Sequence, residues 1–359
     1  MNLAIIGAGG MATYHLQGFR KAGANVVAII DVNTEAGKTF AQSNHIDHSF
    51  TSLKDAINAN LDLEGVSVAI PNKFHFSQVL EALNYSLSVF CEKPPALNAS
   101  EMKQMKEKSE EKGKLLLFDF NNRLRPESLA MMDYIKTGAV GQINTVQASW
   151  IRRNGIPGFG GWFTNKAMSG GGPTIDLLHM LDLGLHFMGY PEPKYVSAVT
   201  FDTFMGNPAF KGPWNIKDSK NGVCDVETSL HAMLVFKTGQ SLMLRNSWAE
   251  MNQRETVSVV FQGTKAGGKV ERIFDVDGLD ETSHDKAELY TVENGRQVDR
   301  NVKFIPDETM GRLDSAMNFV ECIKGEAKPF NTPSEAYILM KIIDALYESA
   351  EQMKSVEVK

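Results

Sequence analysis

A glycine-rich segment near the N-terminus is the feature that most constrains the fold. Residues 3–6 are the apolar run Leu-Ala-Ile-Ile, and residues 7–12 read Gly-Ala-Gly-Gly-Met-Ala. Glycines here let a strand turn sharply into a helix, and they leave the first amide N–H groups of that helix open to a phosphate. Ala12 stands where a third glycine is usual, and a small residue suffices there. We expect this segment to bind a dinucleotide through Gly7, Gly9, Gly10, Met11 and Ala12.

An acidic residue closes the second apolar run. Asp31 follows residues 26–30, Val-Val-Ala-Ile-Ile, and lies nineteen residues after Ala12. This spacing is typical of the acid that binds the ribose of a dinucleotide. The carboxylate would repel a 2′-phosphate, and the following Val32 and Asn33 supply no cation for one, so NAD is expected rather than NADP. The alternative is an ordinary glycine-rich turn beside a surface aspartate.

Length, charge and cysteine content limit the class of protein. A chain of 359 residues exceeds the size of one hydrophobic core, so two domains are expected. The net charge of −6, without runs of like charge, argues against nucleic acid as a partner. Three widely spaced cysteines fit a reducing compartment and no metal site. Because the sequence shows no leader segment and no long apolar stretch, we expect a cytoplasmic protein that does not contact a membrane.

The first third of the chain alternates strands with helices. Strands are expected near 2–7, 25–31, 65–70, 87–92 and 114–120, and helices near 10–22, 34–43, 74–85 and 99–112. This alternation is typical of a parallel sheet with helices on both faces. The expected fold class is therefore α/β, beginning with a doubly wound Rossmann domain over residues 1–121.

The rest of the chain, residues 122–359, has a different pattern. After a helix near 126–137, strands are expected near 143–153, 195–204, 225–236, 240–249 and 256–262, with one internal helix over 174–188. Such a run of strands predicts an open, mostly antiparallel sheet that needs a cover on each face. The internal helix can cover one face and a second subunit the other, so we expect a homodimer or homotetramer. Two final helices, near 311–324 and 333–353, are expected to pack near the first domain.

Polar residues follow several of these predicted elements. Residues 92–95, Glu-Lys-Pro-Pro, come directly after a strand, at the edge where parallel sheets bind ligands. Residues 71–75, Pro-Asn-Lys-Phe-His, follow the preceding strand at the same edge. Further along, residues 170–172 are all glycine and lead into a helix that carries Asp176 and His179. We expect this helix to present both side chains on one face.

Together these motifs resemble, in kind and order, those of the Gfo/Idh/MocA oxidoreductase family, which includes inositol dehydrogenases and glucose–fructose oxidoreductases. The resemblance covers essentially the whole chain. It rests most on Glu92-Lys93-Pro94 and on the glycine-rich segment leading to Asp176, His179 and Asp182. The spacing Asp-x-x-His is one residue shorter than the usual Asp-x-x-x-His. Because one residue rotates a helix by about 100°, the role of Asp176 is less firmly implied than that of His179.

The resemblance implies a dehydrogenase that moves a hydride between a nicotinamide and the CH–OH group of a sugar, polyol or glycoside. His179 would be the general base, a task suited to imidazole. Lys93 would stabilise the alcohol oxygen, and Asp176 would orient the site. The remaining residues expected to bind cofactor are Pro71, Asn72, His75, Glu92, Lys93 and Asn121. Those expected to bind the carbohydrate, besides Asp176 and His179, are Arg123, Arg152, Arg153 and Trp162.

Two other functions remain open from the sequence. One is a redox-neutral enzyme that holds NAD tightly and cleaves or epimerises a glycoside. The other is a regulator that senses NAD without turnover, although a sensor needs no base. The fold alone does not decide among them.

Overall fold

The computed structural model describes residues 1–214, 216–274 and 278–359. The chain forms two compact units, each made of two segments. The first unit comprises Met1–Asn121 and Gly311–Tyr337, and the second comprises Asn122–Met310 and Ile338–Lys359.

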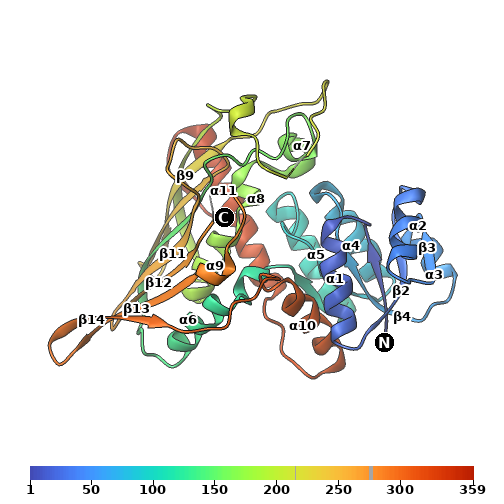
Figure 1. Ribbon diagram of the computed structural model, residues 1–359, viewed down its shortest axis with the longest axis horizontal. Coiled ribbons are helices and arrows are strands. Elements are labelled where there is room, and N and C mark those ends of the chain that lie inside the picture. The colour runs from blue at the N-terminus through green and yellow to red at the C-terminus, as the bar shows by residue number, and fades with distance from the viewer. Residues whose placement is uncertain (215, 275–277) are drawn as a thin grey trace. The chain divides into compact units, whose positions relative to one another are not determined.

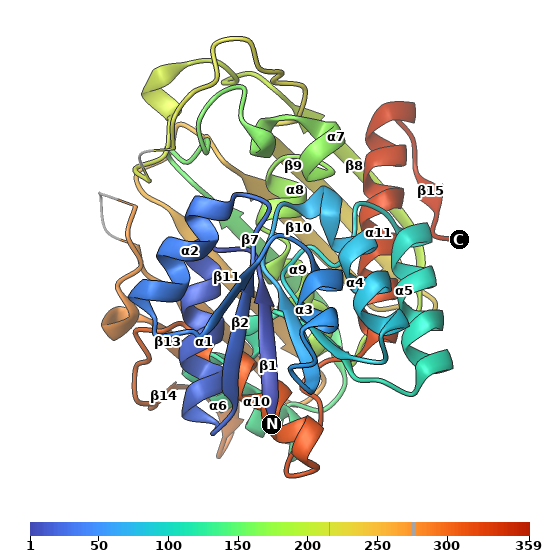
Figure 2. The ribbon, with the colours of Figure 1, turned by 90° about the vertical axis from the view of Figure 1, so that its right-hand side faces the viewer.

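The first unit is a parallel sheet with helices on both faces (Figure 2). Its strand order is β3-β2-β1-β4-β5-β6, and every neighbouring pair is parallel. This is the doubly wound order of the Rossmann fold, with the reversal of direction between β1 and β4. The strands are β1 (Asn2–Ile6), β2 (Asn25–Ile30), β3 (His48–Phe50), β4 (Leu63–Val68), β5 (Ser88–Cys91) and β6 (Leu116–Phe118). The helices are α1 (Gly10–Lys21), α2 (Thr34–Ser43), α3 (Leu53–Asn58), α4 (His75–Asn84) and α5 (Ala99–Lys112), with a short 3-10 turn, η1, at Asn72–Phe74.

Helix α10 (Arg312–Lys324) completes the core of this unit although it comes from the far end of the chain. It packs against α1, and its Phe319 ring lies 5.8 Å from Phe19 and 5.7 Å from Phe90. All three rings are fully buried. The central strand β1 is buried on both faces, as strands of parallel sheets are.

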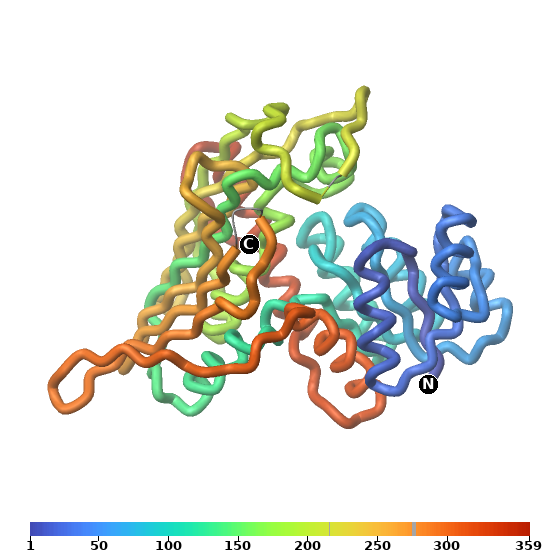
Figure 3. Tube along the Cα trace, in the orientation of Figure 1, coloured from blue at the N-terminus to red at the C-terminus, as the bar shows by residue number. Residues whose placement is uncertain are grey.

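The second unit is built on a nine-stranded sheet (Figure 1). The strand order is β14-β13-β12-β11-β7-β10-β9-β8-β15, and β7 with β10 is its parallel pair while the other neighbours run antiparallel. The expected open, mostly antiparallel sheet is confirmed. The strands are β7 (Ile143–Ile151), β8 (Pro193–Phe201), β9 (Ser229–Phe236), β10 (Ser241–Ser247), β11 (Thr256–Gly263), β12 (Gly267–Arg272), β13 (Lys286–Glu293), β14 (Arg296–Val302) and β15 (Val356–Glu357). The β13–β14 hairpin reaches beyond the other strands (Figure 3).

The two faces of this sheet are covered by other elements to different extents. Helix α9 (His179–Phe187) packs against β7 and β11, and its Gly184 approaches Leu242 so closely that a Cβ would lie 3.0 Å from that side chain. Apolar side chains on this face are buried: Leu230, Leu234, Phe236, Leu242 and Leu244. The opposite face carries apolar side chains that are 37 to 51% exposed: Tyr195, Val199, Phe201, Met233 and Met243.

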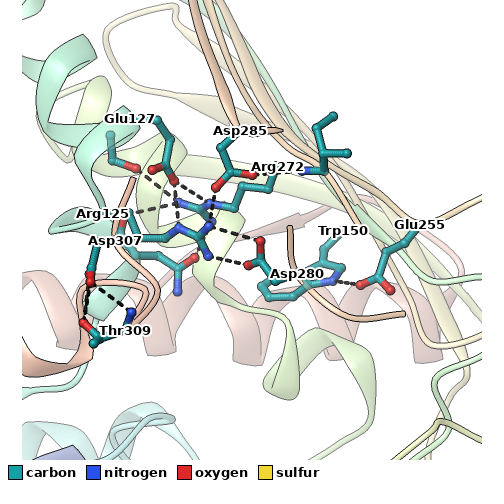
Figure 4. A network of polar contacts seen from close by, with 12 residues as sticks. Arg125, Glu127, Trp150, Glu255, Arg272, Asp280, Asp285, Asp307 and Thr309 are labelled. Atoms are coloured by element: carbon teal, nitrogen blue, oxygen red, sulfur yellow. Dashed lines mark hydrogen bonds and ion pairs between the residues drawn. The ribbon is translucent and has the colours of Figure 1, made fainter. Parts of the chain in front are cut away.

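A buried cluster of charges joins α6 (Pro126–Lys136) to β12 and the segment after it (Figure 4). Arg272 donates to Glu127 at 2.8 Å, and Arg125 donates to the same carboxylate at 2.8 Å and to Asp280 and Asp285 at 2.7 and 2.5 Å. Burial alone would raise the pKa of Glu127, but the two guanidinium groups outweigh it and lower that pKa. The charges of this buried cluster therefore depend on one another, because removal of one would leave its partner buried without a counter-charge.

The structure corrects several expected elements. The single helix over 174–188 is instead two, α8 (Pro173–Asp176) and α9, with a break at residues 177–178. Several short or polar elements were not predicted, among them α3, β3, α7 (Lys166–Ser169), β12, β13, β14 and β15. Strand β14, Arg-Gln-Val-Asp-Arg-Asn-Val, is an exposed edge strand with little apolar alternation to reveal it. At the start of α11 (Pro333–Gln352), Thr332 and Glu335 cap each other's backbone N–H groups.

Candidate active site

The turn after β1 has the geometry that the glycines predict. Gly7 adopts a φ of +101°, and a Cβ there would lie 2.2 Å from the carbonyl oxygen of Ala69, so only glycine fits. A Cβ on Gly9 or Gly10 would meet none of the described atoms within 4 Å, so the space before α1 is open. Ala12 is fully buried where the helix meets the sheet. The first N–H groups of α1 thus face a space suited to a pyrophosphate.

Asp31 lies at the carboxyl end of β2 beside this turn. Its Oδ2 accepts a hydrogen bond from the backbone N–H of Ala8 at 2.8 Å, and its Oδ1 accepts one from that of Asn33 at 2.8 Å. Because each carboxylate oxygen has two lone pairs, both still have capacity for a ribose hydroxyl. The next two residues in the sequence, Val32 and Asn33, carry no positive charge. These residues fit NAD.

The segments after β4 and β5 are joined by a buried histidine. The Nδ1 of His75 lies 2.8 Å from the carbonyl oxygen of Pro94, and its Nε2 lies 2.8 Å from that of Ile70. Burial lowers the pKa of His75, against the raising effect of the two carbonyl contacts. These contacts hold the turn at Pro71 and Asn72 beside the 92–95 segment. Asn121, which follows β6 in the chain, is buried.

Glu92 fixes the backbone that carries Lys93. Its Oε2 accepts a hydrogen bond from the N–H of Lys93 at 3.1 Å, while Oε1 lies 3.1 Å from Nε2 of His15. No motif in the sequence marks His15 as a functional residue. In the structure it faces two carboxylates, those of Glu92 and Asp119.

In the second unit, close packing explains the glycine run before α8. A Cβ on Gly171 would lie 1.8 Å from the hydroxyl of Tyr347, and one on Gly172 would lie 2.2 Å from the backbone oxygen of Glu227. The buried Glu227 carboxylate accepts hydrogen bonds from the N–H groups of Gly172 and Thr174, each at 3.1 Å, and from the Tyr347 hydroxyl at 2.9 Å. Glu227 therefore caps the short helix that ends at Asp176.

Asp176 is held by two side chains from the sheet. Its Oδ2 accepts from the indole N–H of Trp248 at 2.9 Å and from Nη1 of Arg152 at 3.3 Å. Arg152 also donates to Glu255 at 3.3 Å, and its guanidinium lies over the rings of Trp150 and Trp214, 5.3 and 4.6 Å from their centres. This cluster combines charged groups with aromatic faces, as small-molecule sites commonly do.

His179 begins α9 just beyond the helix break. It is 7% exposed, and its ring centre lies 6.1 Å from that of Trp150. Trp150 in turn donates its indole N–H to Glu255 at 2.6 Å. Burial raises the pKa of Glu255, against the lowering effect of Arg152. The structure thus brings Asp176, His179 and Arg152 into one cluster within this unit.

The other residues expected to bind substrate have different surroundings. Arg123 is only 2% exposed and forms a two-pronged ion pair with Asp182 at 2.7 and 2.9 Å, with the Tyr190 hydroxyl beside it. Arg153 is on the surface and donates to the carbonyl of Gln253. The Trp162 ring stacks on Phe163 at 3.7 Å. Sequence reasoning missed Trp248, Glu255 and Glu227, because no motif marks them.

Comparison with known proteins decides the family. Residues 1–120 match the model for the oxidoreductase family, NAD-binding Rossmann fold, and residues 133–358 match that for its C-terminal alpha/beta domain. The chain belongs to the Gfo/Idh/MocA oxidoreductase family. Among its members, D-glucoside 3-dehydrogenase of Escherichia coli K12 is 30% identical over 361 residues, covering 99% of this chain and 97% of that protein. An inositol 2-dehydrogenase of Rubrobacter xylanophilus is 32% identical over 142 residues, covering 39 and 40%.

Solved structures of Gfo/Idh/MocA type share the fold. Levoglucosan dehydrogenase in complex with NADH and L-sorbose superposes with a TM-score of 0.84 at 20% identity, covering 100% of this chain and 99% of that one. Aldose-aldose oxidoreductase from Caulobacter crescentus gives 0.79 at 20% identity, covering 99% of each chain. The expected family and α/β architecture are confirmed. In the described ranges, no helix has the length and apolarity needed to cross a membrane.

Proposed function

We propose that this protein is an NAD-dependent dehydrogenase that oxidises a CH–OH group of a carbohydrate, with a glycoside as the favoured substrate class. The observation that carries the proposal is the cluster of Asp176, His179 and Arg152 against the Trp150 and Trp214 rings. The similarity to a D-glucoside dehydrogenase over nearly the whole chain supports the substrate class.

Each residue has a chemical task in this proposal. NAD, when bound, supplies the hydride acceptor. His179 takes the proton of the reacting hydroxyl, because imidazole exchanges protons near neutral pH. Lys93 hydrogen-bonds the alcohol oxygen and stabilises the negative charge that develops there. Asp176, oriented by Trp248 and Arg152, accepts a hydrogen bond from a neighbouring hydroxyl.

The decisive experiment is a screen of glycosides, free sugars and polyols with added NAD or NADP, followed through the absorbance of the reduced cofactor. We expect glycosides with NAD to give the fastest reduction. Conversion of a glycoside without net reduction of NAD, detected by mass spectrometry of the products, would identify the redox-neutral alternative. Tight binding of NAD with no conversion of any compound would identify the sensor.

Cofactor choice depends on Asp31. We expect the wild-type protein to bind NAD much more tightly than NADP, and Asp31→Ser to narrow the difference, because the variant loses hydrogen bonds to the ribose and the repulsion of a 2′-phosphate. The loss for NAD should be about 1.5–3 kcal/mol, the range for hydrogen bonds to a charged group. Titration calorimetry with both cofactors measures it. Equal affinities in the wild type would contradict the assignment.

The open face of the second unit's sheet predicts self-association. Met233 and Met243 pair across β9 and β10 on this face, next to the exposed Val199 and Phe201. Contiguous apolar patches of this kind are uncommon on monomers, so we expect a homodimer or a dimer of dimers. Light scattering should show it, and the double substitution Met233→Glu with Met243→Glu should weaken it. Met251→Glu, at an exposed loop position, is the control. A stable wild-type monomer at micromolar concentration would refute this expectation.

A further inference from the structure

His15 is a fully buried polar side chain in the middle of α1, and its ring makes contacts on both sides. Nε2 lies 3.1 Å from Oε1 of Glu92 and 3.7 Å from Oδ2 of Asp119. Nδ1 lies 3.1 Å from Oγ of Ser67. The ring packs against Phe90, with 4.8 Å between centres, so these polar contacts are closed off from water.

The contacts of His15 come from three neighbouring strands. Ser67 is on β4, Glu92 follows β5, and Asp119 follows β6, and these strands are adjacent in the sheet. The imidazole therefore joins the carboxyl ends of three strands, where ligands of parallel sheets bind. Asp119 is anchored on its other side by the hydroxyl of Ser315 on α10, which donates to Oδ1 at 2.6 Å.

A cation beside the Glu92 and Asp119 carboxylates offsets the repulsion between their negative charges. Two buried carboxylates near each other repel, and burial together with Asp119 raises the pKa of Glu92. Burial by itself would lower the pKa of His15, but hydrogen bonds to Asp119 and Glu92 and their charges raise it to about 9. The other titratable groups near Glu92 are the Cys91 thiol, whose pKa burial raises, and the Lys93 ammonium. One nitrogen of His15 and one carboxylate oxygen each of Glu92 and Asp119 lie within 4.8 Å of one another, so an imidazolium in this cluster is close to both carboxylates.

We propose that His15 is a positioning residue whose imidazolium fixes the Glu92 carboxylate. Through the hydrogen bond that the N–H of Lys93 donates to Oε2 of Glu92, it also fixes the backbone that presents the Lys93 side chain. The proposal rests on the role given to Lys93 above. His15 lies on the helix that follows the glycine turn, and in this proposal it acts on the alcohol oxygen only through Glu92 and Lys93.

The first test is His15→Gln, which keeps a hydrogen-bond donor and removes the charge. We expect kcat to fall about 10²-fold, the effect of a displacement of about 1 Å at a reacting group, while the Kd of NAD is unchanged. His48→Gln, an exposed histidine on β3 of the same unit, should change neither value. Adding Asp119→Asn to His15→Gln should restore part of kcat, because one of the two buried negative charges is then gone.

Two outcomes of this test would overturn the proposal. If His15→Gln keeps wild-type kcat, the contact does not position Lys93. If it loses NAD affinity together with kcat, His15 supports the fold of the glycine turn and not Lys93. In either case Lys93→Ala, measured alongside, shows separately whether Lys93 has its proposed role.

The second test needs no substrate. Because the pKa of His15 is raised, the folded state should keep the imidazolium at neutral pH and release its proton near pH 9, and the stability that the cluster contributes should disappear as pH rises through that range. Nitrogen resonances of histidine-labelled protein should show both ring N–H groups of His15 at pH 7. A neutral ring at pH 7 would overturn the proposal even if the enzyme proves to act on another substrate.

Discussion

Replacement of His179 by alanine should lower kcat by about 10²- to 10⁴-fold, the usual contribution of a positioned general base. Lys93→Ala should lower kcat by a similar factor, because the developing oxyanion then loses its charged partner. The Kd of NAD should stay the same for His179→Ala, since His179 lies in the second unit and the glycine turn in the first. Steady-state kinetics on the best substrate of the screen, with NAD binding by calorimetry, measures both.

A matched control separates catalysis from stability. His284→Ala removes an exposed histidine of the same unit and should leave kcat unchanged. The unfolding temperature of each variant shows whether it is folded at the assay temperature. Wild-type turnover in a folded His179→Ala protein would refute the base assignment.

Arg272→Met should lower the free energy of unfolding by about 3–5 kcal/mol, the cost of breaking a buried ion pair by removing one partner. The guanidinium of Arg272 is fully buried, and it also donates to Ser128 at 3.1 Å and to the backbone oxygen of Asn122 at 3.3 Å. Without it, the Glu127 carboxylate loses one of the two guanidinium groups that offset the cost of its burial, and Arg125 remains (Figure 4). Urea denaturation measures the loss.

The neighbouring Lys269 offers a control for Arg272. It lies on the same strand and pairs with Glu271 at 2.8 Å, but both side chains are partly exposed. Because surface ion pairs contribute about 0–1 kcal/mol, Lys269→Met should change stability little. If Arg272→Met were no more destabilising than Lys269→Met, the buried cluster would not stabilise the unit as we describe.

The fold was largely predictable because its strong signals are local. The glycine turn and the alternating elements of the first unit each depend on a few consecutive residues, and the parallel sheet that they predict is confirmed. Strands β12 to β14 were not predicted, since their short and polar sequences gain their order from neighbours in the sheet. Helix α10 joins the first unit by packing against α1. No local sequence pattern predicts this contact, because the two helices are far apart in the sequence.

The candidate site was predictable only where residues belong to a motif. His179 and Asp176 were found from the glycine segment, but their relative directions were not, because the helix is interrupted at residues 177–178 between them. Trp248 and Glu255 contact this cluster from distant parts of the sequence. Arg123 was expected to bind the carbohydrate because arginine often binds ligands. Nothing in the sequence pointed to its carboxylate partner, Asp182, which the structure shows.

The two-segment construction of the first unit has a consequence for synthesis on the ribosome. Residues 1–121 emerge first, but α10, which covers Phe19 and Phe90 with Phe319, lies within Gly311–Tyr337. At about 5–20 residues per second, translation of the intervening chain takes roughly 10–40 s. During that interval the nascent sheet exposes an aromatic surface that its own sequence cannot yet cover. We therefore expect the nascent chain to depend on chaperones until its last third has been made.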